Sequence, residues 1–195
     1  FDNSADTLTI DGISLSQNDR VLIKDGVNSA STGVNHKWNG IYINSKSIEK
    51  NISILNYVEI SDYTYFDNKK IQLTGGINLI NGQFELQNSL FKNSYAEDAI
   101  NLVNSKFKIT NLKISNTSSD AVDIDFGKGK IINSNFEKIL GDAIDLSGSE
   151  VTIKNILAKD VADKAISVGE KSFLTINQLN ISSQVYITYY IYNII

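Results

Sequence analysis

Short runs of alternating hydrophobic and polar residues fill most of the chain and are separated by Gly, Asn, Asp and Ser. Ile, Val, Leu and Phe occupy the hydrophobic positions of these runs, a composition that favours β-strands. No stretch keeps a helical hydrophobic stripe across three turns, and proline is absent. The pattern therefore predicts an all-β protein with almost no helix.

A repeat of 22 residues organises the second half of the chain. Each unit begins with an alanine, followed by two hydrophobic residues that flank one polar residue. The alanines are Ala99, Ala121, Ala143 and Ala165, and the hydrophobic pairs are Ile100/Leu102, Val122/Ile124, Ile144/Leu146 and Ile166/Val168. A second register with the same step consists of Asn111, Asn133, Asn155 and Asn177. With a step of 23 the pattern reaches back to Gly76 and Asn88. More loosely, Gly40 and Asn56 indicate an earlier coil with longer loops.

This period indicates a right-handed parallel β-helix, a solenoid built from coils of about 22 residues. Helical repeats need longer units, and leucine-rich repeats would carry leucine at each structural position. Stacked coils bury a hydrophobic face that one coil cannot bury alone. Alternation predicts that the hydrophobic pair of each unit points inward, and that the alanine and the intervening polar residue point outward. The repeated asparagine tolerates the left-handed conformation, and we expect it to form an inward asparagine ladder.

The units read Asp-Ala-Ile/Val-Asn/Asp-Leu/Ile, as in Asp120-Ala-Val-Asp-Ile and Asp142-Ala-Ile-Asp-Leu. With the repeated asparagine, they resemble the coils of right-handed β-helix proteins of the pectate-lyase-like superfamily, in particular bacterial surface β-helices. The resemblance covers about residues 39–183. It implies the same fold and a place on a cell or virion surface.

The N-terminal part has a different texture. Leu8-Thr-Ile-Asp-Gly and Trp38-Asn-Gly-Ile-Tyr, within residues 7–43, resemble a short β module of phage tail and tail-fibre proteins. We therefore expect an N-terminal β cap or adaptor in residues 1–38 and a β-helix in residues 39–183. Residues 184–195 break the repeat and are expected to form a tail or a cap strand, since terminal repeats are atypical.

Composition limits the partners. The net charge is −4, the pI is about 5.0 and Arg20 is the only arginine, so we expect no nucleic-acid partner. The longest hydrophobic run, residues 185–195, is too short for a membrane span. The absence of cysteine excludes disulfides and thiolate metal sites. We expect an extracellular, cell-surface or virion-associated module that forms part of a larger surface or tail protein.

Aspartates cluster on two successive units and are the strongest candidates for chemistry. They are Asp120, Asp123, Asp125, Asp142 and Asp145. We expect Asp123 and Asp145 to lie one above the other on an outward face, about one strand spacing apart. Two carboxylates at that distance could raise one pKa and act as an acid/base pair. An inverting glycosidase needs roughly 6.5–9.5 Å between its carboxylates, which we expect diagonally between Asp120 and Asp145.

The catalytic candidates for a polysaccharide hydrolase or lyase are Asp120, Asp123, Asp142 and Asp145. The first three are faintly similar to the Asp-x-x-Asp stretch and the second acidic stretch of polygalacturonases. The Gly-His-Gly and Arg-Ile-Lys motifs of that family are absent. Lys164, at the position of Asp142 on the next coil, is the candidate base of a lyase.

Binding is the second functional interpretation. An extended polysaccharide would lie along the outward column Asn101, Asp123, Asp145 and Ser167 and the flat strip of alanines beside it. Tyr63 and Tyr65, in the segment 61–74 that is long enough to overhang, could stack on sugars. The sequence implies no cofactor through a known motif, but Asp123, Asp125 and Asp145 offer the hard oxygen ligands that Ca²⁺ prefers.

A purely structural interpretation of the aspartates is favoured. Aspartate at a coil corner accepts hydrogen bonds from turn amides, and its repetition reflects the repeated turn. Asp98 and Asp142 need no other explanation, and Lys128 or Lys130 would relieve the stacked charges. The sequence thus predicts a structural and/or glycan-binding surface module without a complete catalytic set; the alternative is a polysaccharide hydrolase or lyase.

Overall fold

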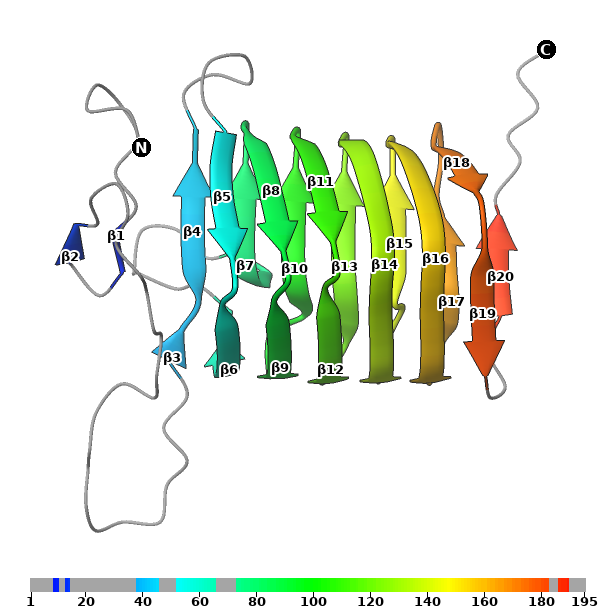
Figure 1. The fold of residues 1–195 in the computed structure, drawn as a ribbon, viewed down its shortest axis with the longest axis horizontal. Coiled ribbons are helices and arrows are strands. Elements are labelled where there is room, and N and C mark those ends of the chain that lie inside the picture. Colours follow the sequence, from blue (N-terminus) through cyan, green and yellow to red (C-terminus); the bar gives the residue numbers. More distant parts are fainter. Residues whose placement is uncertain are drawn as a thin grey trace, which may run out of the picture.

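The computed structural model describes residues 9–10, 13–14, 38–45, 52–65, 73–182 and 186–189. Within these ranges the regular secondary structure consists of β-strands, with no helix. Successive strands wind into a parallel solenoid of about five turns. In Figure 1 the front strands run downward and the back strands upward while the coils advance from the N-terminal to the C-terminal side, which makes the β-helix right-handed. The predicted fold class is confirmed.

Three faces surround the solenoid axis. Face 1 is a parallel sheet of seven strands in the order β20-β17-β15-β13-β10-β7-β4. From the N-terminal side its strands are β4 (Ile41–Asn44), β7 (Gly75–Ile80), β10 (Asp98–Val103), β13 (Asp120–Asp125), β15 (Ile144–Ser147), β17 (Lys164–Val168) and β20 (Tyr186–Tyr189). Its register repeats every 22 or 23 residues, since Asp98 pairs with Asp120 and Ile77 with Ile100.

Faces 2 and 3 belong to the second large sheet. Face 2 consists of β5 (Ile52–Asn56), β8 (Gln83–Gln87), β11 (Lys106–Thr110), the first halves of β14 (Lys128–Ile139) and β16 (Glu150–Val161), and β18 (Phe173–Ile176). Face 3 consists of β3 (Trp38–Asn39), β6 (Glu59–Thr64), β9 (Leu90–Ser94), β12 (Lys113–Thr117), the second halves of β14 and β16, and β19 (Leu179–Ser182). The long strands β14 and β16 run through the corner that separates these two faces in the earlier coils.

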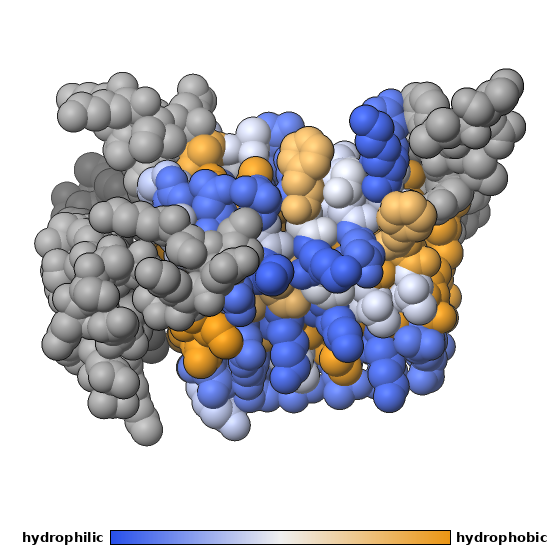
Figure 2. Space-filling view, turned by 90° about the horizontal axis from the view of Figure 1, so that it is seen from above, coloured by the Kyte–Doolittle hydropathy of each residue, from blue (hydrophilic) through white to orange (hydrophobic). Residues whose placement is uncertain are grey.

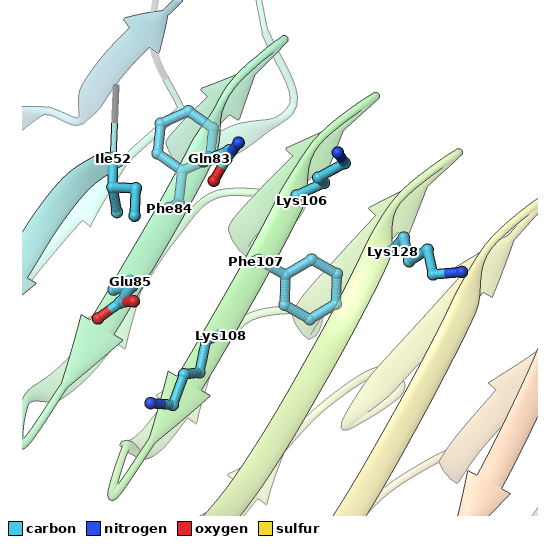
Figure 3. A pocket seen from close by; sticks show the side chains of 8 residues that line it. All are labelled: Ile52, Gln83, Phe84, Glu85, Lys106, Phe107, Lys108 and Lys128. Atoms are coloured by element: carbon cyan, nitrogen blue, oxygen red, sulfur yellow. The ribbon is translucent and has the colours of Figure 1, made fainter. Parts of the chain in front are cut away.

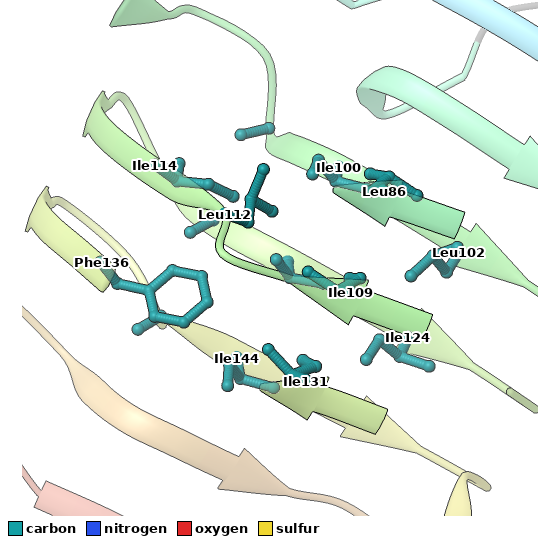
Figure 4. Packing of buried hydrophobic residues seen from close by; sticks show 14 of the residues in the cluster. Leu86, Ile100, Leu102, Ile109, Leu112, Ile114, Ile124, Ile131, Phe136 and Ile144 are labelled. Atoms are coloured by element: carbon teal, nitrogen blue, oxygen red, sulfur yellow. The ribbon is translucent and has the colours of Figure 1, made fainter. Parts of the chain in front are cut away.

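The hydrophobic pairs of the repeat form the core. Ile100, Leu102 and their equivalents on later coils are fully buried, as predicted, and they meet the inward residues of faces 2 and 3, such as Ile109 and Phe136 (Figure 4). Inward residues of adjacent coils stack on each other, so each coil completes the burial of its neighbours.

The alanines of the repeat are not on the surface. Ala99, Ala121, Ala143 and Ala165 are at most 1% exposed and belong to the core. The prediction of an outward alanine strip is therefore wrong. The chain turns into face 1 at this point, and the register between β10 and β13 omits the alanines. The alternation of inward and outward side chains begins only after this corner. At the corner itself only a small side chain such as alanine fits.

Left-handed residues recur on successive coils at two corners, between faces 1 and 2 and between faces 2 and 3, and also within the strands of face 3. Their φ angles are positive in three columns: Asn81, Asn104, Phe126 and Gly148; Asn88, Asn111, Asn133 and Asn155; and Asp62, Asn93, Asn116, Lys138 and Asp160. Asparagines within a column are hydrogen-bonded from coil to coil: the side-chain Nδ2 of Asn111 donates to Oδ1 of Asn88 at 2.8 Å, and Asn155 donates to Asn133 at 3.0 Å. The predicted ladder exists, but Asn111, Asn133 and Asn155 are exposed, so its inward direction was wrong.

Buried serines follow several of these corner residues. The Oγ atoms of Ser134 and Ser149 accept hydrogen bonds from the amides of Leu112 and Gly127 on the preceding coil, at 3.2 and 2.9 Å. The left-handed residue thus points outward, and the next residue turns inward to satisfy an amide that the corner leaves without a strand partner. Seen from above, the edge between faces 1 and 2 is mainly hydrophilic and carries separate hydrophobic groups (Figure 2).

The two ends of the chain are described only in part. Of the expected cap in residues 1–38, the structure describes a two-stranded antiparallel pair, β1 (Thr9–Ile10) and β2 (Ile13–Ser14), and Trp38 in β3. In the segment 184–195, β20 pairs in parallel with β17 and so extends face 1; the rest of both segments lies outside the described residues. None of the described residues forms a helix long and apolar enough to cross a membrane.

Candidate functional site

Face 1 carries the predicted polar column. Asn101 pairs with Asp123, Asp123 with Asp145, and Asp145 with Ser167, so these residues lie one above another on four successive strands. Neighbouring strands are about 4.8 Å apart, which sets the spacing of their side chains. Asp123 and Asp145 are partly exposed, whereas Asn101 and Ser167 are each 8% exposed. The sequence therefore identified the register of this column, and its middle is the accessible part.

A second column runs along the corner at the start of face 1. It comprises Asp98, Asp120, Asp142 and Lys164. Oδ1 of Asp120 accepts the amide of Asp142 at 2.7 Å, and Oδ1 of Asp142 accepts the amide of Lys164 at 2.9 Å. The predicted bond between a corner aspartate and a turn amide is thus present at Asp120 and Asp142.

The cation at this corner is Lys164. Its Nζ lies 3.0 Å from both carboxylate oxygens of Asp142. Lys128 and Lys130, which were expected to relieve the aspartates, lie instead on face 2, where Lys128 forms an ion pair with Glu150. The sequence could not distinguish these lysines, because their position depends on which face of the coil each segment joins.

The remaining carboxylates of this region crowd together, and the ion pairs of the described residues give them no cation. Burial raises the pKa of Asp123 to about 8, and the neighbouring carboxylates of Asp98, Asp125, Asp145 and Asp120 add to the rise. Burial also raises the pKa of Asp98 to about 6, against the effect of a hydrogen bond with the side chain of Thr74. The pKa values of Asp120, Asp125 and Asp142 are raised as well, first of all by burial. We refer to the six aspartates of this region as the acidic face: Asp98, Asp120, Asp123, Asp125, Asp142 and Asp145.

Three oxygen ligands converge within the acidic face. One carboxylate oxygen from each of Asp120, Asp142 and Asp145 lies within 4.8 Å of the others. The sequence had instead grouped Asp123, Asp125 and Asp145 as candidate calcium ligands; Asp145 is common to both sets. The difference arises because the corner brings Asp120 and Asp142 toward the column, a convergence that alternation along one strand does not reveal.

Asn101 adds a further oxygen near this region. Its Nδ2 donates to Oγ1 of Thr74 at 2.9 Å, whereas its buried Oδ1 has no hydrogen-bond partner among the residues that the structure describes. Asn101 pairs with Asp123 on the adjacent strand, so this carbonyl belongs to the same surface column. The unpaired oxygen was not foreseen, because it depends on Thr74 in the preceding coil.

The carboxylate separation bears on the catalytic interpretation. The nearest oxygens of Asp120 and Asp145 lie within 4.8 Å, which is shorter than the roughly 6.5–9.5 Å of inverting glycosidases. This proximity of single oxygen atoms does not fix the distance between the two carboxyl groups, so the expected separation stays a prediction. Retaining enzymes hold their carboxyl groups roughly 5–5.5 Å apart. Asp120 and Asp142 also accept hydrogen bonds from backbone amides, so these two candidates have a structural role that is independent of any catalysis.

The two tyrosines proposed to stack on sugars differ in position. Tyr63 lies on β6 with no exposed surface, and burial raises the pKa of its hydroxyl. Its ring packs in the core beneath the backbone of Gly76, so Tyr63 cannot stack on a ligand and this assignment is corrected. Tyr65 is 40% exposed. Within the segment 61–74, residues 66–72 lie outside the described part of the chain.

Comparisons with protein-family models, curated protein sequences and solved structures gave no match. The class that the strand pairing defines is a parallel β-helix, and the acidic face is its candidate functional site.

Proposed function

We propose that the chain is a structural and glycan-binding β-helix module of an extracellular or virion-surface protein. The observation that supports this function is the column Asn101–Asp123–Asp145–Ser167 on a continuous parallel sheet. Such a sheet holds its side chains at fixed spacing, so an extended ligand binds without ordering the protein first. The proposal includes kinship with the pectate-lyase-like superfamily and a tail-fibre type of N-terminal module, on the sequence patterns alone.

The chemistry of this face suits sugar hydroxyls. Carboxylates accept hydrogen bonds only, and charge-assisted bonds are the stronger ones. Asp125 and Asp145 provide such acceptors at partly exposed positions. Tyr65, which follows β6 of face 3, offers a separate exposed ring. A protonated Asp123 would also donate a hydrogen bond, because its pKa of about 8 keeps the acid form populated at neutral pH. The face thus combines acceptors with one donor.

A glycan panel tests this proposal. The protein is incubated with neutral and uronate-rich polymers, with and without calcium, and both binding and new reducing or unsaturated ends are recorded. We expect binding that the double variant Asp123→Asn/Asp145→Asn weakens and that Asp160→Asn, on face 3, leaves unchanged. Absence of binding to every polymer would leave a structural spacer as the function.

The second candidate is a polysaccharide hydrolase or lyase that uses Asp120, Asp123, Asp142 and Asp145. It is supported by the short separation of Asp120 and Asp145 together with the raised pKa of Asp120, since one carboxyl must stay protonated to act as an acid. Chain cleavage in the same panel, lost in Asp145→Asn, would establish this activity in place of simple binding. Unsaturated ends would indicate a lyase, for which Lys164 is the proposed base.

We also propose Ca²⁺ as a ligand of the acidic face. Asp120, Asp142 and Asp145 converge as described, and Ca²⁺ takes six to eight oxygen ligands, so water or a glycan would complete its coordination. Calcium should then raise the melting temperature of the protein, and Asp145→Asn should abolish the rise. An equal rise in the variant would refute a site that includes Asp145.

A further inference from the structure

The last coil leaves both large sheets open at the C-terminal side of the solenoid (Figure 1). Its strands are β18 on face 2, β19 on face 3 and β20 on face 1. β18 and β19 each pair with β16, β20 pairs with β17, and no further described strand pairs with any of the three. Each therefore has one free edge of backbone N–H and C=O groups. We refer to these three strands as the open end.

The inward positions of the open end are hydrophobic and only partly covered. Ile176 continues the column of the fully buried Ile153, yet it is 43% exposed. Ile187 continues the column of Ile166 and is 46% exposed, and Ile181 on β19 is 37% exposed. On inner coils the equivalent positions are buried because the next coil covers them. The open end therefore presents a hydrophobic surface of the kind that another layer of strands covers.

The open end carries no charge. Residues 172–195 contain no Asp, Glu, Lys, Arg or His, whereas residues 150–171 contain eight charged residues. Earlier coils carry outward charges on the same sheet: around a hollow on face 2, Figure 3 shows Glu85, Lys106 and Lys128. Free strand edges are usually protected from edge-to-edge pairing by charged side chains or proline. The open end has neither, so its composition favours pairing with further strands.

The shape of the open end matches a second copy of itself. A parallel solenoid rises by about one strand spacing, 4.8 Å, in each turn. The end is therefore a spiral that rises from β18 through β19 to β20, with its step at the corner between faces 1 and 2. A two-fold axis through that corner places β18 against β20 of the second copy and β19 against its own copy. The low part of one spiral then meets the high part of the other, so the gap is even along all three strands.

Strand length and charge agree with this arrangement. β18, β19 and β20 have four residues each, so no strand extends beyond the strand that it meets. The chain has a net charge of −4, and two copies repel each other through most of their surface. The uncharged open end is where two copies approach with the least repulsion.

We propose that the open end is a homodimer interface at which two copies of the chain join end to end about a two-fold axis. The three strands extend both sheets across the interface as antiparallel pairs, and the inward isoleucines of the two copies cover each other. Because the interface consists of three short strands, we expect a dissociation constant in the micromolar range. The open end is separate from the acidic face, so this inference does not rest on the function proposed above.

Sedimentation equilibrium of the full chain between about 1 and 300 μM tests the association. Ile176→Lys introduces a charge into the interface from both copies, so we expect dimerisation to weaken by about tenfold or more. Ile54→Lys makes the same change at an exposed isoleucine of β5, far from the open end, and should leave the dissociation constant within about twofold. Circular dichroism establishes that each variant is folded.

Cysteine probes test the two-fold axis, because the chain has no cysteine of its own. Asn180→Cys, on β19, should cross-link to its own copy with a short bis-maleimide, since β19 meets itself. Thr175→Cys, equally exposed on β18, should not, since β18 meets β20. An unmodified chain that stays monomeric, a dimer that Ile176→Lys leaves intact, or equal cross-linking of both cysteine variants would overturn the proposal. So would head-to-tail assembly into open chains of many copies.

Discussion

Single residues at the corners decide how well each coil fits its neighbours. Phe126 occupies a left-handed position that Asn81 and Asn104 hold in the two preceding coils. Nδ2 of Asn104 donates to Oδ1 of Asn81 at 2.8 Å, and the ring of Phe126 is 69% exposed. The left-handed region costs most residues about 1–2 kcal/mol, and asparagine tolerates it best after glycine. Phe126 therefore interrupts the ladder and carries strain.

Phe126→Asn should stabilise the protein by about 1 kcal/mol, since it removes this strain and can donate a new bond to Asn104. For a chain of this size we expect the melting temperature to rise by about 2–4 °C. Thermal unfolding followed by circular dichroism measures the change. As a control, Asn104→Ala should lower the melting temperature; a destabilised Phe126→Asn would show that the exposed ring has a packing role.

The raised pKa values of the acidic face predict a dependence of stability on pH. The pKa of Asp123 is about 8 in the folded protein and 3.8 for an unperturbed aspartate, so the folded state binds more protons than the unfolded state between these pH values. Stability should therefore fall as the pH rises from about 4 to about 8, with Asp98 contributing up to about pH 6. Melting temperatures across this range test the direction.

Asp123→Asn should flatten that pH dependence. At about pH 8 the variant should melt about 2–4 °C higher than the unmodified protein, because it removes one buried negative charge from a crowded group. At about pH 4 the two proteins should melt together, since Asp123 is protonated there. Asp160→Asn, outside the acidic face, is the control; a variant that is less stable at both values would contradict the assignment.

The ends of the strands depend on hydrogen bonds that side chains accept from backbone amides, as well as on hydrophobic alternation. Ser149, 1% exposed at the corner before β16, accepts the amide of Gly127 and donates to the carbonyl oxygen of Ile124 at 2.8 Å. It thereby ties its own corner to the preceding coil. The sequence pattern did not single out this serine, because its importance comes from a partner 22 residues away.

Ser149→Ala should destabilise the protein by about 1–3 kcal/mol, because it leaves the buried amide of Gly127 without an acceptor. Thr152→Ala, on the outward side of the same strand, should change stability by less than about 0.5 kcal/mol. Urea unfolding compares the two free energies. Equal effects would indicate that water replaces the serine hydroxyl.

The whole molecule is a linear stack in which each coil contacts its neighbours. Stability in such a stack is the sum of coil and interface contributions, and end coils have only one neighbour. We expect amide hydrogen exchange to be slowest in β11, β14 and β16 and faster in β4, β18 and β19. Mass spectrometry of exchange measures this order; uniform protection would contradict the linear model.

A core substitution tests the same coupling. Ile131, fully buried in β14, pairs with Ile109 and Ile153 on the two adjacent coils. Ile131→Ala should cost about 2–5 kcal/mol. It should also accelerate exchange in β11 and β16 more than in β4. Lys130→Ala, next to it but exposed, is the matched control and should leave the exchange pattern unchanged.

The repeat made much of the fold predictable from the sequence. A step of 22 or 23 residues fixes which residues stack, so the register of Asn101, Asp123, Asp145 and Ser167 followed directly. Hydrophobic alternation identified the inward pairs, such as Ile100 and Leu102. What repetition could not give was the direction of residues at the corners, where alternation stops; this is why the alanines and the asparagine ladder were placed on the wrong side.

The candidate site shows the same division. The sequence determined that aspartates recur on adjacent coils, because equal spacing along a solenoid means adjacency in space. Only the tertiary structure decided that Asp120 and Asp142 turn toward Asp145, that Lys164 pairs with Asp142, and that Lys128 belongs to another face. These contacts depend on the angle through which the chain turns at each corner. Hydrogen bonds between coils hold the residues at the corner before face 1, and alternation along one strand does not reveal these bonds.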